Sequence, residues 1–440
     1  MNTTARQTTA VVVGAGLSGL VTAHELHRSG IDVVVLESAD RVGGRTLAET
    51  SALGSRLDLG GQWIGHDHAR VVELGTELGL TAFPMHSWPL PRLVDGTRRI
   101  RPVAPAVLTA GAALGVLSIL LRVRGSARWA DVPVSTWIAK VPGRRARRLL
   151  EVVALISWTG DLDRLSVQAM LSLIGRQGGL RTILSTKGGA QDSLLVEGAG
   201  SLAERLATGL GARVRTGHRV ASIRRDDQGA TVRTTSGEEF RAEHVVVTAP
   251  PPAAARITHE PALPAGRAAI EQQMWMGSVY KAIAVYDRPF WRGHTVAEQI
   301  ALGRPGFAAF DSSPPGGPGH LCLLVGGPEA EEIAALTPQA RQRTLLQALA
   351  TSLGPATLQP AGWHEKSWHL DEHALGGYVA LPGLGSTDTM PPLPSEPVGR
   401  VHWAGAETAS DHPGYLDGAI ESGRRAAHEI LQALGATSSR

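Results

Sequence analysis

The stretch VVVGAGLSG, residues 11–19, decides the fold of this 440-residue chain. The apolar, β-branched run at 11–13 predicts a strand that is buried on both faces. From residue 20 the apolar positions follow a helical period as far as Gly30, and 31–36 is a second apolar strand that ends at Glu37. A strand, a glycine turn, a helix and a strand in this order predict a dinucleotide-binding βαβ unit.

The glycines of this turn have separate physical reasons. Gly14 allows the tight turn, Gly16 lacks the Cβ that would hold a pyrophosphate away from the backbone, and Gly19 lets the helix pack closely on the strand. The first helical N–H groups then face the phosphates with the helix dipole behind them. Glu37 lies where a carboxylate accepts hydrogen bonds from ribose hydroxyls, and it disfavours the extra phosphate of NADP.

A second glycine-rich loop, Gly43-Gly44-Arg45, follows Glu37 closely. Two glycines and an arginine can form another anion-contacting loop on the same cofactor. A NAD-binding dehydrogenase with a glycine-rich loop is one interpretation. However, the turn at 14–19, Glu37 and this loop together resemble the flavin-containing amine oxidase family, the group of monoamine and polyamine oxidases.

The resemblance implies an α/β fold in which a Rossmann-like FAD-binding domain is interleaved with an α+β substrate domain. We expect the FAD-binding domain to comprise residues 1–85, 192–268 and 372–440, and the substrate domain 86–191 and 269–371. The pattern predicts helices at 69–78, 106–121, 144–156 and 166–173, and a last helix that opens within 412–420 and continues to 434. It predicts strands at 213–215, 218–225, 230–235, 243–248, 279–286, 321–325 and 363–368. Ser201 and Glu204 predict a capping box for a helix that ends near Leu210.

Composition excludes several classes of protein. An apolar fraction of 43% and a charged fraction of 19% are ordinary for a soluble globular chain. The net charge is +3, and no nucleic-acid motif accompanies the arginines, so no nucleic-acid partner is expected. Cys322 is the sole cysteine, which excludes an intramolecular disulfide and a zinc set. With no signal-peptide pattern at the N-terminus, we expect a cytoplasmic protein.

One uncharged stretch, residues 103–121, is long enough to span a bilayer. It contains Pro105, Gly111 and Gly115, so its hydrophobicity is modest. We therefore expect a buried or substrate-cavity helix. The polar residues 435–440 likewise do not resemble the membrane anchor of some family members.

The resemblance extends to other segments that would contact the cofactor. It implies that Gly60-Gly61-Gln62-Trp63 lies against the flavin, with Trp63 toward the substrate and Val220 meeting the adenine through its backbone. It also implies that Glu407 contacts the phosphate or ribityl portion. The expected cofactor-binding residues are Gly14, Gly16, Leu17, Ser18, Gly19, Glu37, Ser38, Gly43, Gly44, Arg45, Gly60, Gly61, Gln62, Trp63, Val220, Gly405, Glu407, Gly414, Tyr415, Leu416 and Ala419.

Lys281 falls in the otherwise apolar strand 279–286. Burying a lone ammonium is costly and lowers its pKa, which favours a functional reason for it. The resembled family places a lysine here, bonded through a water to the flavin N5. Trp368 corresponds to a family tryptophan near the flavin.

The chain departs from the covalent branch of the family at Gly376-Gly377-Tyr378-Val379. That branch carries a flavin-linked cysteine after the glycine pair, and Tyr378 cannot form the thioether. We therefore expect FAD to be held without a covalent bond. The resemblance makes Tyr415 one wall of an aromatic amine cage, and Tyr378, Val379 or Trp368 remains open as its partner.

The sequence thus predicts an FAD-dependent amine oxidase, with dioxygen reduced to hydrogen peroxide and the imine hydrolysed to an aldehyde or ketone. Three alternatives remain: an L-amino-acid oxidase, a flavin-dependent desaturase or oxidase of an apolar metabolite, and a non-catalytic flavin-fold module. The first needs an arginine for the substrate carboxylate, whereas Gln62-Trp63-Ile64-Gly65 follows the glycine pair. The identity of the amine and the oligomeric state stay open, a homodimer being the family's habit. No acid is evident for a diamine's second nitrogen.

Overall fold

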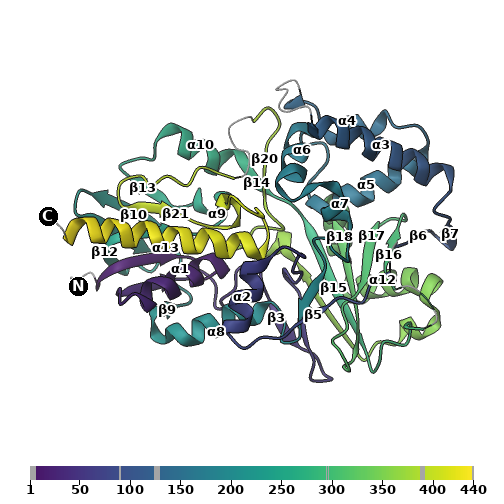
Figure 1. The fold of residues 1–440 in the computed structure, drawn as a ribbon, viewed down its shortest axis with the longest axis horizontal. Helices are drawn as coiled ribbons and strands as arrows, with labels where there is room; N and C mark the ends of the chain where they lie inside the picture. Colours follow the sequence, from purple (N-terminus) through teal and green to yellow (C-terminus); the bar gives the residue numbers. More distant parts are fainter. Residues whose placement is uncertain are drawn as a thin grey trace.

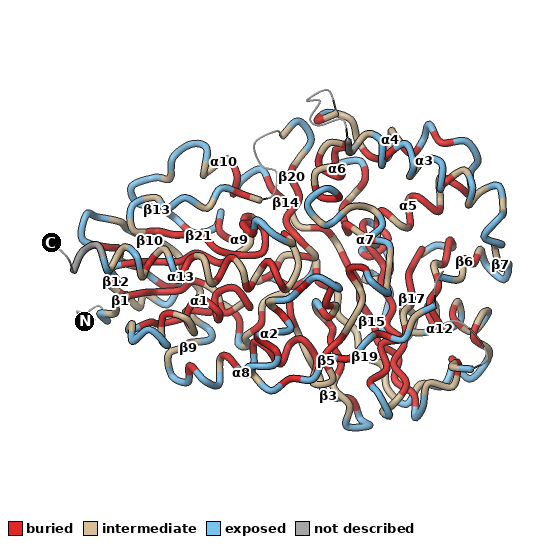
Figure 2. The backbone as a smooth tube through the Cα atoms, in the orientation of Figure 1, coloured by how far each residue is buried: buried red, intermediate tan, exposed pale blue. Residues whose placement is uncertain are grey.

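The computed structural model describes residues 6–88, 91–122, 129–293, 295, 297–386 and 392–438. Two large sheets lie side by side, and both ends of the described chain lie at the end of the molecule that holds the first sheet (Figure 1). Buried backbone runs through the middle of both halves, with the exposed residues outside (Figure 2).

The first sheet contains the strand that the glycine turn follows. Its order is β13-β10-β11-β12-β1-β2-β9, with β21 beside β12. The strands are β1 (Arg6–Val13), β2 (Val33–Leu36), β9 (Val214–Arg215), β10 (Val220–Asp226), β11 (Gly229–Thr234), β12 (Glu239–Val247), β13 (Thr258–Glu260) and β21 (Val401–Trp403). β1 runs parallel to β2 and β12, which confirms the predicted βαβ arrangement.

Successive residues of β1 are buried on opposite faces of this sheet. Val12 packs with α1 (Leu17–Arg28), α8 (Gly200–Leu210) and the C-terminal helix α13 (Leu416–Ser438), whereas Val11 packs in the core on the other side. The two chain ends therefore build one layer, because α1 lies directly against α13 (Figure 1).

The second sheet has the order β19-β15-β18-β17-β16-β6-β7. Its strands are β6 (Arg92–Asp95), β7 (Arg98–Ile100), β15 (Val279–Tyr286), β16 (Gln299–Ala301), β17 (Phe307–Asp311), β18 (Gly319–Gly326) and β19 (Gly362–Ser367). One face, with Tyr280 and Ala282, packs on α11 (Pro328–Ala334) and α12 (Pro338–Leu353). The other face, with Val279 and Ile283, packs against Leu57 and Leu59 from the segment that follows the second glycine loop.

Five helices form a separate apolar cluster above the second sheet (Figure 1). They are α3 (Pro105–Arg122), α4 (Val134–Ala139), α5 (Arg144–Trp158), α6 (Val167–Arg176) and α7 (Gly179–Leu184). The predicted helices at 106–121, 144–156 and 166–173 are confirmed.

The expected burial of α3 is wrong. Ala110 and Leu117 face the cluster, but Leu108 and Ile119 are 61% and 63% exposed. α3 contacts the helices α5, α6 and α7, while its side chains at Leu108 and Ile119 stay largely exposed. Within the described residues, the structure contains no helix with the length and apolar character needed to cross a membrane.

Short elements complete the chain. They are α2 (Ala69–Glu77), β3 (Ala48–Thr50), β4 (Arg56–Asp58), β5 (Ala82–Pro84), β8 (Ser193–Leu195), α9 (Pro251–Ala254), α10 (Ala265–Gln273), β14 (Met274–Met276) and β20 (Ala380–Pro382). The pairs β5–β8 and β14–β20 join distant segments of the chain. The strands of each large sheet come from the segments assigned to each domain, and we propose the predicted boundaries as the division of the molecule.

The predicted capping box at α8 is wrong. The helix begins at Gly200, and the Ser201 hydroxyl donates to the carbonyl of Glu197. The Asp58 carboxylate, from β4, accepts the N–H groups of Ala199 and Gly200 at 2.8 and 3.0 Å. A side chain from elsewhere therefore satisfies the helix start, which a local motif cannot reveal.

Candidate active site

A cavity of about 540 Å³ extends from the first glycine turn to the second sheet. Most of the predicted site residues line it, although they come from distant parts of the chain. They are Gly14, Gly16, Leu17, Ser18, Glu37, Ser38, Gly43, Gly44, Arg45, Gly60, Gly61, Gln62, Trp63, Val220, Lys281, Trp368, Tyr378, Gly405, Gly414, Tyr415, Leu416 and Ala419. The structure thus brings these residues together; Gly19 and Glu407 lie behind the cavity wall.

The first turn presents unshielded backbone to the cavity. Gly14 has φ +110°, a conformation that favours glycine, and a Cβ added to Gly16 would meet nothing within 4 Å. Helix α1 begins at Leu17 without a side-chain cap, so its first N–H groups are available to an anion. Glu37 accepts the N–H groups of Ala15 at 2.7 Å and Ala39 at 2.8 Å, which fixes its carboxylate at the end of β2.

Two predicted glycines are required by packing rather than by an open ligand site. A Cβ on Gly19 would lie 2.0 Å from the carbonyl oxygen of Gly14. A Cβ on Gly60 would lie 2.3 Å from the carbonyl oxygen of Arg45, so the close approach expected there is to the second glycine loop. Both positions therefore exclude a side chain whatever the cavity holds.

Glu407 differs from its expected role because it contacts a protein cation. Its carboxylate pairs with Arg45 at 2.6 and 2.9 Å and accepts the N–H of Ala380 at 3.1 Å. Burial acts to raise the pKa of Glu407, but the guanidinium and the hydrogen bonds outweigh it and the pKa is lowered. Because its carboxylate is paired with Arg45, Glu407 holds the loop at 43–45 in position. Glu407 itself does not line the cavity.

Lys281 is buried on the face of β15 that borders the cavity. It is 3% exposed, and its Nζ donates to the carbonyl of Gly60 at 2.8 Å and to Oε1 of Gln62. The ammonium also lies 5.4 Å from the centroid of the Trp63 ring. Burial lowers the pKa of Lys281, against the opposing effects of Cys322 and Asp58. The lone lysine of the apolar strand is therefore tied to the loop at 60–63.

Sequence reasoning missed Asp58 as part of this environment. Its carboxylate is 6% exposed, and burial raises its pKa although the backbone N–H groups and Lys281 act in the opposite direction. Asp58 thus helps to balance the buried ammonium while holding the start of α8. The only sequence feature that could have indicated Asp58 is its position directly before Leu59-Gly60-Gly61. Its contacts with the start of α8 become visible only in the folded loop.

Aromatic rings line the cavity beside Lys281. Trp63 meets Phe310 edge-on with ring centroids 5.1 Å apart, and the Trp368 indole donates to the carbonyl of Leu59 at 2.8 Å. The buried Tyr378 hydroxyl has no hydrogen-bond partner in the described part of the chain. Burial raises the pKa of Tyr415 to about 12, so this phenol stays neutral. All three expected partners of Tyr415 reach the wall.

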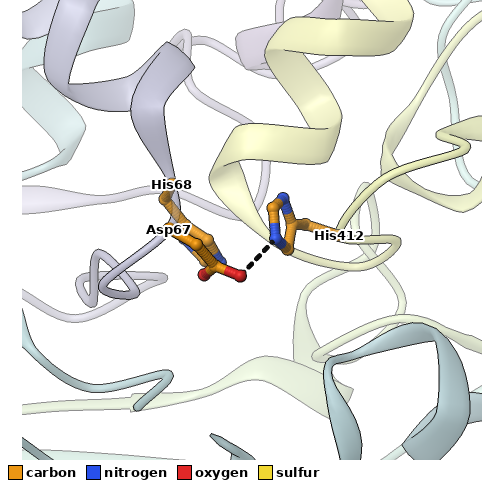
Figure 3. A group of neighbouring side chains, drawn as sticks. All are labelled: Asp67, His68 and His412. Carbon is orange, nitrogen blue, oxygen red and sulfur yellow. Dashed lines mark ion pairs between the residues drawn. The ribbon is translucent and has the colours of Figure 1, made fainter. Parts of the chain in front are cut away.

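Asp67, His68 and His412 form a polar cluster (Figure 3). His412 contacts Asp67 at 3.1 Å through Nε2 and Asp417 at 3.1 Å through Nδ1. His68 is buried, and its ring is 5.0 Å from that of Tyr415. The pKa of His412 is raised, chiefly by its hydrogen bond to Asp417, so the ring is held between two anions.

The comparisons with known proteins agree with this architecture. Residues 17–431 match the family described as flavin containing amine oxidoreductase. The chain is 32% identical to the probable flavin-containing monoamine oxidase A of Dictyostelium discoideum, covering 96% of this chain and 97% of that protein. It is 30% identical to the flavin-containing amine oxidase B of Sus scrofa, covering 97% and 86%.

Solved structures of amine oxidases are also similar to this chain over nearly its whole length. Cyclohexylamine oxidase from Brevibacterium oxydans superposes with a TM-score of 0.92 at 30% identity, covering 97% of this chain and 99% of that one. Putrescine oxidase bound to putrescine gives a TM-score of 0.85 at 25% identity, covering 98% and 100%. The chain therefore belongs to the flavin-containing amine oxidoreductase family.

The protein is an FAD-dependent amine oxidase. Its cavity fits that cofactor, because the open backbone at Gly16, the uncapped start of α1 and the loop at 43–45 all line it, and an uncapped helix start suits a phosphate. The single cysteine, Cys322, is buried in β18 and does not line the cavity, which leaves no thiol on the described wall for a flavin thioether.

Proposed function

We propose that the protein oxidises the amine in the part of the cavity between Lys281 and Tyr415. Bound FAD would supply the acceptor for a hydride equivalent from the α-carbon of the amine, whose nitrogen loses a proton, and dioxygen would take up the two electrons and two protons as hydrogen peroxide. The imine that leaves is hydrolysed to an aldehyde or ketone. The observation that supports this site most directly is the buried ammonium of Lys281 on the cavity wall.

We propose a separate role for each group of wall residues. The first turn and the loop at 43–45 hold the phosphates, and Arg45 is kept in place by Glu407. Lys281 holds a water at its third donor position, since Gly60 and Gln62 take the other two hydrogens. The rings of Tyr415, Tyr378 and Trp368 orient the amine and exclude water. Because the cofactor supplies the difficult chemistry, this set needs no strong general base.

The arginines on the wall support an amine over an amino acid. Arg41 donates to backbone carbonyls of its own loop, Arg45 pairs with Glu407, and Arg219 and Arg256 contact Glu372. Arg41, Arg45 and Arg219 therefore have protein partners, whereas Arg256 donates a single hydrogen bond to the backbone carbonyl of Glu372; among the described wall residues no other arginine occurs. An amino-acid carboxylate needs such a partner to enter a desolvated cavity.

Anaerobic flavin reduction tests the proposal directly. Purified protein with bound FAD is mixed with tryptamine or phenylethylamine and, separately, with tryptophan or phenylalanine. We expect the flavin to bleach with the amines and peroxide to form when oxygen is admitted. Bleaching by the amino acids alone would refute the proposal, and protein that takes up no FAD would refute the site.

We propose that the protein acts in the cytoplasm, which the absence of disulfides would suit. A homodimer is the assembly we propose from the family. Size-exclusion chromatography with light scattering on the FAD-loaded protein tests that assembly.

A further inference from the structure

We propose that Glu298 binds a second cationic group of the substrate, so that the enzyme prefers long diamines or linear polyamines to monoamines. This inference rests on the proposed function, since it gives a substrate-binding role to another residue of the same cavity. Glu298 lies immediately before β16 and lines the cavity.

The registers of the second sheet fix the relation between Glu298 and Lys281. Lys281 is opposite Leu324, Leu324 is opposite Ala308, and Ala308 is opposite Ile300, so these residues form one row across four strands. All four line the cavity, and Glu298 also does so, two residues before Ile300. Because side chains at i and i+2 share a face, Glu298 and Ile300 point the same way.

This row gives the length of substrate that can bridge the two ends. Lys281 and Ile300 are separated by three strand steps, and steps of about 4.8 Å put their backbones about 14 Å apart. Glu298 lies further along β16, which adds to the separation. An amine that reacts beside Lys281 can therefore place a second nitrogen at Glu298 only if a long chain connects the two.

The environment of Glu298 suits a cation from outside the protein. The side chain is buried, and its carboxylate accepts the N–H of Trp88 and the hydroxyl of Thr186, each at 3.0 Å. Within the described residues, no ion pair involves this carboxylate. Its remaining lone pairs can accept further donors, and a buried carboxylate without a cation is unfavourable. Burial raises the pKa of Glu298, and a substrate ammonium would lower it again.

The cavity wall between Lys281 and Glu298 is apolar, as a long diamine would need. The row between Lys281 and Glu298 presents Leu324, Ala308 and Ile300, which can cover a methylene chain. Trp88, whose backbone N–H donates to Glu298, is 52% exposed, whereas Glu298 and Lys281 are each 3% exposed. A dicationic chain would thus find an anion at Glu298, an apolar middle and the reaction site beside Lys281.

The test compares diaminooctane with octylamine, which differ only in the terminal ammonium. We expect the wild-type enzyme to show a lower KM for diaminooctane, and Glu298→Gln to raise that KM about 10- to 100-fold, the usual range for a charged hydrogen bond. The KM for octylamine should stay unchanged or fall. Glu298→Asp, which keeps the charge, should restore part of the preference.

Glu271→Gln is the matched control. Glu271 is also a buried carboxylate, but it pairs with Arg267 and does not line the cavity. Its substitution should leave the ratio of the two KM values unchanged, and FAD content and thermal melting verify that each variant folds. If Glu298→Gln is unstable, Thr186→Val, which removes one hydrogen bond to Glu298, should still reduce the preference.

Two results would overturn the inference: a wild-type enzyme that does not prefer diaminooctane, or a Glu298→Gln variant in which both KM values change equally. Either leaves the proposed function intact as long as octylamine bleaches the flavin. Failure of every amine to bleach FAD-loaded enzyme would instead refute the proposed function.

Discussion

Replacing Lys281 by methionine tests the centre of the site. Methionine keeps most of the side-chain volume but removes the only ammonium among the wall residues that the structure describes. The carbonyl of Gly60 and Oε1 of Gln62 then lose their donor, which costs about 1–3 kcal/mol for each unsatisfied buried group. Removing a desolvated charge offsets part of this cost. We therefore expect a net loss of about 2 kcal/mol in stability, with FAD retained.

The effect on catalysis should be larger than the effect on folding. If Lys281 holds a water at the reacting part of the cofactor, its loss should slow flavin reduction or reoxidation about 100-fold, which corresponds to about 2.7 kcal/mol in the barrier. Stopped-flow absorbance measures reduction anaerobically and reoxidation after oxygen is added. The bound FAD is quantified first, so that a lost cofactor is not mistaken for a slow step.

Lys366→Met is the matched control for this experiment. Lys366 is the residue opposite Lys281 on β19, but its Nζ pairs with Asp371 at 2.8 Å and it does not line the cavity. The control variant should reduce and reoxidise flavin at the wild-type rate. Unchanged kinetics in Lys281→Met, or an equal slowing in Lys366→Met, would show that the assigned role of Lys281 is wrong.

Three further predictions follow from the packing and the charges of the site. Gly19→Val should cost about 3 kcal/mol and weaken FAD binding, because the new Cβ would lie 2.0 Å from a carbonyl oxygen of the first turn; thermal melting and FAD absorbance measure both. Arg45→Ala should cost about 3 kcal/mol, since it leaves the Glu407 carboxylate buried without its cation, and normal melting would contradict this. Protonated His412 should stabilise the fold, because its folded-state pKa is raised above 6.5; this stability is complete below pH 6.5 and is lost as the pH rises through the folded pKa. The wild-type melting temperature should therefore fall relative to that of His412→Gln over this range, and parallel curves would refute the role.

Local sequence motifs were enough to predict many of the residues that line the cofactor end of the cavity. The glycines at 14, 16 and 19 are required by turn geometry and close packing, and those causes act within a few residues of the chain. Lys281 was recognisable for a similar reason, since a lone charge in an apolar strand conflicts with its surroundings. The main helices and strands followed from local periodicities, whereas the two-domain fold class followed from the resemblance to the family.

Predictions from local sequence patterns were wrong where a residue from a distant part of the chain makes the contact. Ser201 has the spacing of a helix cap, yet Asp58 from β4 occupies that role. Glu407 was expected to contact the cofactor, but its carboxylate pairs with Arg45, which is 362 residues away in the chain. The uncharged stretch at 103–121 was expected to be buried, but Leu108 and Ile119 of α3 are largely exposed, because α3 packs on the other helices through Ala110 and Leu117.

By itself, the sequence determined the dinucleotide-binding turn, the family and the lysine of the apolar strand. Only the tertiary structure placed Glu298 in the same cavity as Lys281, because that relation depends on the pairing of β15, β18, β17 and β16. Strand pairing joins residues far apart in the chain, and its register depends on side-chain packing across the sheet. The lysine of the proposed reacting end is therefore recognisable from its local sequence, whereas the substrate length and charge that we propose depend on how the strands assemble.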